Sequence, residues 1–193
     1  MRVEHILAAS GLELEQDGPL YRVAMECQTF IRESCGLPVF KFLPETYADL
    51  QKVKVRKHKT SSKFADTFNE AFEREAKDLR QRAVFTESAR PTQVDGKDLF
   101  YVLPRDGYKY MYCTEVKHSV DDYKQVFDSL FEQFEEKKAE QLIHDLLKFS
   151  YVRDNLHEGI KEEAEIIFYN IPYYYAARVS TTKYEDLLTQ LTQ

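Results

Sequence analysis

The stretch 162–179, Glu-Glu-Ala-Glu-Ile-Ile-Phe-Tyr-Asn-Ile-Pro-Tyr-Tyr-Tyr-Ala-Ala-Arg-Val, holds two short β-prone runs. The first covers 164–169 and the second 173–179, and the link Asn170-Ile171-Pro172 separates them, because proline cannot continue a strand ladder. Short strands of this kind, unevenly interleaved with helices, predict an α+β fold in which helices pack on a mostly antiparallel sheet. They do not fit a doubly wound parallel sheet.

Near the N-terminus, the segment 19–35 has helical spacing of its apolar residues and begins with Pro19, a residue favoured at a helix start. Gly36 is expected to end this helix. The next run, 38–44, is bounded by prolines and predicts a strand with Lys41 on the face opposite its phenylalanines.

Two further helical regions are predicted. Ser61 or Ser62 can cap a helix that runs to about Arg80. Ser119 can cap another helical region, which continues to Phe149 either as two helices or as one bent helix.

The segments 98–103 and 108–113 alternate as strands do, and Pro104-Arg105-Asp106-Gly107 stands between them. Glycine accepts a positive φ and aspartate can bond its own backbone in a turn, so this pattern predicts a hairpin. Near the C-terminus, Thr182-Lys183-Tyr184-Glu185 has the form of a capping box before a short helix.

Length and charge limit the classes of function. The chain has 193 residues, which fits a single domain over 1–193 with an N-terminal helical part at about 1–36 and a mixed core at about 37–193. Its 27 Lys+Arg and 33 Asp+Glu give a net charge of -6. That balance argues against broad nucleic-acid binding, which requires a basic surface. The 13 Tyr and 13 Phe are interpreted first as core residues.

The sequence predicts a cytoplasmic protein that neither spans nor binds a membrane. No uncharged run approaches the roughly 20 residues that cross a bilayer, and the first residues do not resemble a secretory signal. Three cysteines without CxxC spacing and five scattered histidines predict neither a disulfide framework nor a metal site. Phosphate-loop, dinucleotide-fingerprint and serine-nucleophile motifs are also missing from the sequence.

Lys52 to Lys59 is the concentrated positive stretch of this acidic chain. One interpretation is an edge strand on which lysines prevent pairing with other chains. The other is a local basic patch that forms a phosphate-binding rim. A nuclease or another nucleic-acid enzyme that uses this stretch is one function compatible with it.

Two motifs could carry chemistry together. Arg82-Ala83-Val84-Phe85-Thr86-Glu87-Ser88 reads as a strand that ends in hydroxyl groups. In Glu162-Glu163-Ala164-Glu165, the second and third glutamates are expected on one strand face, because strand side chains repeat every two residues. Such a pair can bind a ribose hydroxyl and stabilise an oxocarbenium ion, although a solvated strand entrance is the more common meaning of the pattern.

The order of these motifs resembles the ADP-ribosyltransferase fold of the Arg/Ser-Thr-Ser/Glu-x-Glu class, particularly its small phage-encoded members. The resemblance spans about 37–179 as a pattern of strands, with 37–43, 84–88 and 163–168 as the three motif strands. The sequence departs from the family at Lys41, which stands where the family has arginine. It departs again at Thr86-Glu87-Ser88, which replaces Ser-Thr-Ser.

The resemblance implies a role for each motif residue. Glu165 would stabilise the oxocarbenium ion and contact the nicotinamide ribose, and Glu163 would orient the acceptor. Thr86 and Ser88 would hold the ribose region, and Lys41 would steady the diphosphate.

The implied function is a mono-ADP-ribosyltransferase that uses nicotinamide adenine dinucleotide (NAD) to modify a host protein or nucleic acid. The alternative is a noncatalytic, degenerate phage protein of the same fold that acts through protein-protein interaction or as a virion-associated factor. Lys41 decides between an active and a degenerate member of the family, because it stands in place of the family's arginine and cannot make the bidentate phosphate contact of arginine.

Overall fold

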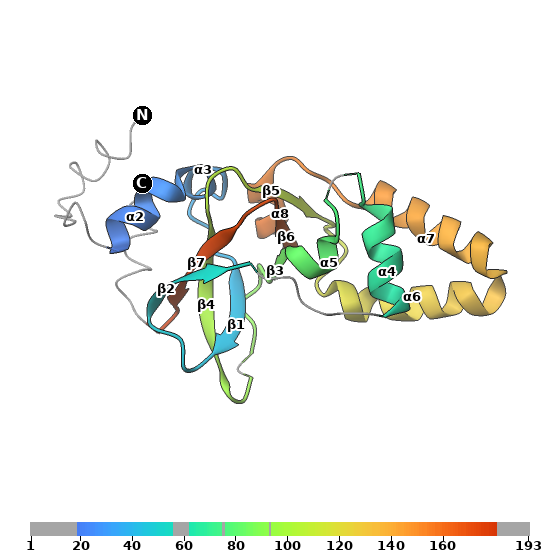
Figure 1. The fold of residues 1–193 in the computed structure, drawn as a ribbon, viewed down its shortest axis with the longest axis horizontal. Helices are drawn as coiled ribbons and strands as arrows, with labels where there is room; N and C mark the ends of the chain where they lie inside the picture. The colour runs from blue at the N-terminus through green and yellow to red at the C-terminus, as the bar shows by residue number, and fades with distance from the viewer. Residues whose placement is uncertain (1–18, 56–61, 75, 93, 181–193) are drawn as a thin grey trace.

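A computed structural model describes residues 19–55, 62–74, 76–92 and 94–180, and these form an α+β fold. The described strands make a four-stranded sheet of order β1-β4-β7-β2 and a three-stranded sheet of order β3-β6-β5, each fully antiparallel (Figure 1). The strands are β1 (Phe40–Pro44), β2 (Leu50–Lys54), β3 (Val84–Thr86), β4 (Lys97–Pro104), β5 (Lys109–Tyr112), β6 (Ile166–Tyr169) and β7 (Tyr173–Arg178). The prediction of helices on antiparallel strands is confirmed, with two sheets in place of one.

The described helices lie at the two ends of the molecule and beside the sheets (Figure 1). They are α2 (Pro19–Glu26), α3 (Gln28–Glu33), α4 (Lys63–Ala71), α5 (Leu79–Arg82), α6 (Ser119–Gln133), α7 (Glu136–Ser150) and α8 (Leu156–Lys161). The antiparallel pair α6 and α7 extends away from the sheets, and α4 packs beside it (Figure 1).

The two sheets pack face to face, and helices cover their outer faces. One core cluster lies between the sheets and includes Phe100 and Ala176 of the larger sheet with Phe168 of the smaller one. The outer face of the three-stranded sheet packs on α4, α6 and α7 through a second cluster that includes Ile167. Because β6 is covered on both faces, all four of its residues are buried, which explains its continuous apolar sequence.

The predicted hairpin over 98–113 is wrong, since its two strands belong to different sheets. The segment β4 pairs with β1 and β7, whereas β5 pairs with β6. The turn at 104–107 therefore carries the chain from one sheet to the other, and the link at 170–172 does the same between β6 and β7. Gly107 has the expected positive φ of 92°, but the Asp106 carboxylate accepts from the Thr29 amide of α3 and not from its own turn.

Helix boundaries differ from the sequence-based prediction in two places. The N-terminal helix is divided into α2 and α3 at Cys27, where φ is -122°. The helix that Ser62 caps, through a bond from the Ala65 amide, ends at Ala71 and does not reach Arg80. Leu79 begins the separate short helix α5.

The region 119–150 forms two helices, one of the two arrangements that the sequence allowed. Ser119 is not the cap that was predicted. His118 holds the cap position, and the Asp122 carboxylate accepts from the backbone amides of Lys117 and His118. The Ser119 hydroxyl is buried and accepts a hydrogen bond from the Arg80 guanidinium group.

Part of the basic stretch lies in β2, at the edge of the four-stranded sheet, where Lys52 and Lys54 are exposed. This agrees with the edge-strand interpretation for 50–54. Residues 56–61 and the predicted helix after Thr182 lie outside the described residues. Among the helices that the structure describes, none combines the length and apolar character needed to cross a bilayer.

Candidate functional site

Three segments that are far apart in the sequence meet where β1, β3 and the start of β6 lie together. Phe40 and Glu87 form an isolated antiparallel bridge between the first two. The Lys41 ammonium group donates to the carbonyl oxygen of Phe85 at 2.9 Å. Lys41 and the segment 84–88, which is β3 and the two residues after it, are therefore direct neighbours.

The two hydroxyls of this strand connect it to the segment that holds Glu165. The Thr86 hydroxyl, which is 1% exposed, donates to the Ile166 carbonyl oxygen at 2.9 Å. The Ser88 hydroxyl donates to the Ala164 carbonyl oxygen at 2.6 Å. Glu165 lies between these two acceptors in the sequence, so both hydroxyls hold the backbone on either side of it.

The Glu165 carboxyl group is buried just before β6 begins. The residue is 6% exposed, and its backbone amide donates to the Val116 carbonyl oxygen at 2.9 Å. Burial raises the pKa of Glu165, while hydrogen bonding from Ser119 and the charge of Arg80 lower it in part. Among the described residues, its Oε2 atom has no hydrogen-bond partner. This oxygen is itself buried, so it is an unsatisfied acceptor inside the protein.

Arg80 is a site residue that the sequence did not single out. Its guanidinium group donates from Nη1 to the Ser119 hydroxyl at 2.8 Å and lies 4.1 Å from the centre of the Phe85 ring. Burial lowers the pKa of Arg80, and the Glu165 charge opposes that shift. The sequence pattern placed Arg80 at the end of a long helix, whereas the structure has it in the separate short helix α5, where its charge interacts with Glu165.

Lys41 is the second cation of the site. Burial lowers its pKa, and the charges of Glu165 and Glu87 raise it. The cluster of Lys41, Arg80 and Glu165 therefore combines two cationic groups with one carboxyl group in a partly buried environment. Because a low dielectric strengthens such interactions, this arrangement favours an additional negative charge.

Glu163 does not share a strand face with Glu165, so that part of the sequence prediction is wrong. Strand β6 begins only at Ile166. Glu163 follows α8 with a positive φ of 58° and is exposed. The left-handed conformation reverses the chain there, and period-two alternation does not apply across it.

Three cavities lined by described residues have volumes of about 320, 470 and 480 Å³. None of these three is lined by Lys41, Thr86, Ser88 or Glu165. The described part of the chain also places no group of three histidine, cysteine, aspartate or glutamate side chains where they could hold a metal ion. The candidate site is thus a partly covered polar cluster and not one of these three cavities.

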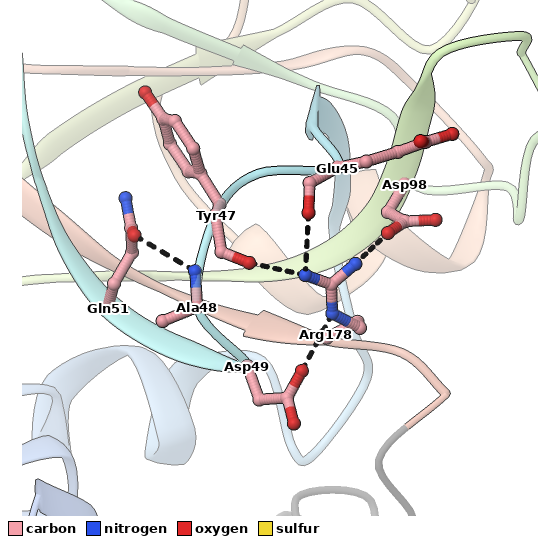
Figure 2. Close-up of polar contacts among 7 residues, drawn as sticks. All are labelled: Glu45, Tyr47, Ala48, Asp49, Gln51, Asp98 and Arg178. Carbon is pink, nitrogen blue, oxygen red and sulfur yellow. Dashed lines mark hydrogen bonds and ion pairs between the residues drawn. The ribbon is translucent and has the colours of Figure 1, made fainter.

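Arg178 lines the smallest of these three cavities and is the centre of a separate polar cluster (Figure 2). Its guanidinium group contacts Asp98 and bonds Asp49 at 2.8 Å. The Glu45 and Tyr47 carbonyl oxygens accept two further bonds from it (Figure 2). These contacts fix the loop between β1 and β2 to the end of β7, and they use the guanidinium fork for structure.

No family model, no curated protein and no solved structure matches the chain.

Proposed function

We propose that the protein is an NAD-dependent mono-ADP-ribosyltransferase whose site is the cluster of Lys41, Arg80 and Glu165. The observation that carries this proposal is the meeting of three short motifs, around positions 41, 86 and 165, through the bonds of Lys41, Thr86 and Ser88. These are the motifs on which the family resemblance rests.

The residues present fit a dinucleotide in two respects. Lys41 and Arg80 together supply the positive charge that a diphosphate needs, and the Arg80 guanidinium provides the planar donor group that Lys41 lacks. The Oε2 atom of Glu165 is a buried acceptor without a partner among the described residues, so it would accept a hydrogen bond from a ribose hydroxyl once the groups that cover it move aside. NAD would supply the ADP-ribose group, and nicotinamide would be the leaving group.

Glu165 would act as a carboxylate that stabilises positive charge developing at the ribose, since it lies in a low-dielectric environment where such an interaction is strong. Ser119 and Arg80 would favour the ionised form of this carboxyl group, because their interactions oppose in part the rise in its pKa that burial causes. Thr86 and Ser88 would act through the backbone on both sides of Glu165, because they donate to its neighbours' carbonyl oxygens. Glu163, which is exposed, would orient the acceptor, a host protein or nucleic acid.

The proposal is tested by incubating the purified protein with NAD labelled on its adenylate phosphate, alone and with a bacterial lysate. We expect label on protein or nucleic acid. Glu165→Gln should lower the rate of transfer by about 100-fold or more, as loss of a transition-state charge contact does. Glu162→Gln is the matched control, because it removes an exposed carboxylate from the same segment.

A second pair of measurements separates the two glutamates. If Glu163 orients the acceptor, Glu163→Gln should lower transfer to macromolecules and spare hydrolysis of NAD by water. Glu165→Gln should lower both rates together. Equal rates in wild type and Glu165→Gln would remove the catalytic role.

Binding provides a test that does not depend on turnover. Lys41→Arg should tighten NAD binding by about tenfold where the guanidinium adds a second charge-assisted hydrogen bond. Calorimetric titration of both proteins measures this. If neither wild type nor Lys41→Arg binds NAD at millimolar concentration, the proposal of a dinucleotide site is wrong.

A noncatalytic interaction protein is the second candidate, and exposed apolar residues of α7 favour it. Phe149 is 87% exposed and Leu146 is 36% exposed on this helix. Large exposed apolar side chains at one place on a surface are typical of a protein interface. Loss of partner binding in Phe149→Ser, with no NAD-dependent transfer in wild type, would favour this second function.

A further inference from the structure

Two cavities beside the three-stranded sheet are both lined by Tyr169. The first has a volume of about 480 Å³ and is lined in part by Tyr108, Tyr110 and Tyr169. The second has a volume of about 470 Å³ and lies against Tyr169 and the loop that follows it. We call them together the Tyr169 groove. Neither cavity includes Lys41, Glu165 or Arg80.

Cationic side chains from separate parts of the chain line this groove. Arg74 follows α4, Lys109 lies in β5, and Arg153 lies between α7 and α8; all three line the first cavity and are exposed. Lys77 and Arg82 line the second cavity. Convergence of cations that are distant in the sequence produces a local positive surface that the net charge of the whole chain does not predict.

Several of these groups are held in place. The Arg153 guanidinium donates to the Tyr151 carbonyl oxygen at 3.3 Å and lies 5.9 Å from the Phe72 ring. The Tyr108 hydroxyl donates to the Glu33 carboxylate at 2.6 Å, so the acidic residue that lines the first cavity already accepts a bond. Asp78 pairs with Arg82 at 3.5 Å beside the second cavity.

The acidic character of the protein is concentrated elsewhere. The helix pair within 119–150 has eight Asp+Glu and four Lys, and it extends away from the sheets (Figure 1). The helix pair thus contributes four of the six net negative charges of the chain. Repulsion from distant exposed charges is screened beyond about 8–10 Å at physiological salt.

We propose that the Tyr169 groove binds single-stranded nucleic acid. Cations that follow a backbone, combined with aromatic rings on which bases stack, are the combination that single-strand binding requires. Tyr108 and Tyr110 are half-buried neighbours with ring centres 6.1 Å apart, and they face the same cavity as three cations. An acidic peptide needs the cations but not the rings, so the tyrosines favour a nucleic acid over a peptide.

This inference is independent of the proposed transferase, because its residues are different and its test involves no NAD. The test measures fluorescence anisotropy of a labelled single strand of about 12 nucleotides, as DNA and as RNA, at several salt concentrations starting near 50 mM. We expect micromolar binding that weakens as salt rises. A duplex of the same sequence should bind at least about fivefold more weakly, because its bases cannot stack on tyrosine.

Two variants test the two kinds of contact. Arg74→Ala combined with Lys109→Ala should weaken binding at least tenfold and lower the salt slope by about 1.4, since each phosphate contact to a single strand contributes about 0.7. Tyr110→Leu should weaken binding about fivefold or more without changing that slope. The matched control combines Lys124→Ala with Lys137→Ala, two exposed lysines of α6 and α7, and should bind as wild type does. Circular dichroism and thermal melting confirm that each variant folds.

Several results would overturn the proposal. They are no binding at about 100 µM protein in low salt, binding unchanged by the groove variants, or equal loss in the control. A combined substitution of Arg56, Lys57 and Lys59 that alone removes binding would move the site to the basic stretch. Competition by polyglutamate as strong as that by the unlabelled single strand would identify an acidic polymer as the ligand.

Discussion

The Ser88 hydroxyl donates to the Ala164 carbonyl oxygen at 2.6 Å and joins residues that are 76 positions apart. Together with the bond from Thr86 to the Ile166 carbonyl oxygen, it fixes both neighbours of Glu165. The carboxyl group at the centre of the candidate site is thus held by the backbone, and that backbone is held by side chains of another strand.

Ser88→Ala should lower the free energy of unfolding by about 1 kcal/mol, because a partly buried carbonyl loses its hydrogen-bond donor. Urea denaturation of wild type and variant measures the change. Ser88→Thr, which keeps a hydroxyl, is the control and should lose less. An unchanged midpoint for Ser88→Ala would show that solvent replaces this bond at no cost.

Glu165→Gln should change the dependence of stability on pH. Burial raises the pKa of Glu165 above its ordinary value of 4.5, so the folded state holds this proton more tightly than the unfolded chain. That contribution is fully present below about pH 4.5 and is lost as pH rises through the folded-state pKa. The Glu165→Gln side chain carries no charge at any pH, so the variant does not lose this stability as pH rises.

The melting temperature of Glu165→Gln should therefore exceed that of wild type at neutral pH, and the difference should narrow toward pH 4.5. Glu163→Gln, at an exposed position, should follow wild type throughout. A variant that is less stable than wild type at neutral pH would show that the ionised carboxylate is a favourable partner of Arg80.

Gly159→Ala should destabilise the protein, although alanine is the better helix former. A Cβ atom at position 159 in α8 would lie 2.7 Å from Cγ of the buried Tyr112 ring. Overpacking of this kind costs about 1–3 kcal/mol. Thermal or urea denaturation checks the sign, and the double variant with Tyr112→Leu should recover part of the loss.

Arg178→Lys should lower the free energy of unfolding by about 1.5–3 kcal/mol, the range for hydrogen bonds to charged groups. Lysine keeps the charge but cannot bond Asp49, Asp98 and the loop carbonyl oxygens at the same time (Figure 2). Denaturant unfolding measures the loss. Arg90→Lys, at an exposed residue of the same cavity, is the control, and a similar cost for both would contradict the role of the guanidinium fork.

Two substitutions in α7 should have opposite consequences for folding. Leu147 is 0% exposed, so Leu147→Ala should cost about 2–5 kcal/mol. Phe149 is 87% exposed, so Phe149→Ser should leave the free energy of unfolding within about 0.5 kcal/mol of wild type. Chemical denaturation distinguishes them. A large cost at Phe149 would mean that its ring is covered in solution.

Local physics allowed the sequence to predict many elements. The proline-bounded run at 38–44 formed β1, and the apolar run before Asn170 formed β6. Ser62 capped α4 as expected. In each of these, residues within one turn or one strand specify the conformation, so the information is contiguous in the sequence.

The sequence-based prediction was wrong where contacts between distant segments determine the structure. In the sequence, β4 and β5 have the pattern of a hairpin. In the structure each strand pairs in a different sheet, because the choice of partner depends on which strand faces can be buried. Asp106 bonds α3 and not its own turn. Turn composition specifies a reversal of the chain but not the strand that lies beside it afterwards.

Local sequence patterns are sufficient to predict the α+β class, the aromatic core and the residue types available at positions 41, 86, 88 and 165. Tertiary packing brings these positions together and links Arg80 to Glu165 through Ser119, and it leaves Glu163 exposed, outside β6. Helical and strand periods are local properties of a chain. The environment of a carboxyl group depends instead on which distant segments exclude water from it, and that is fixed only when the sheets and helices pack together.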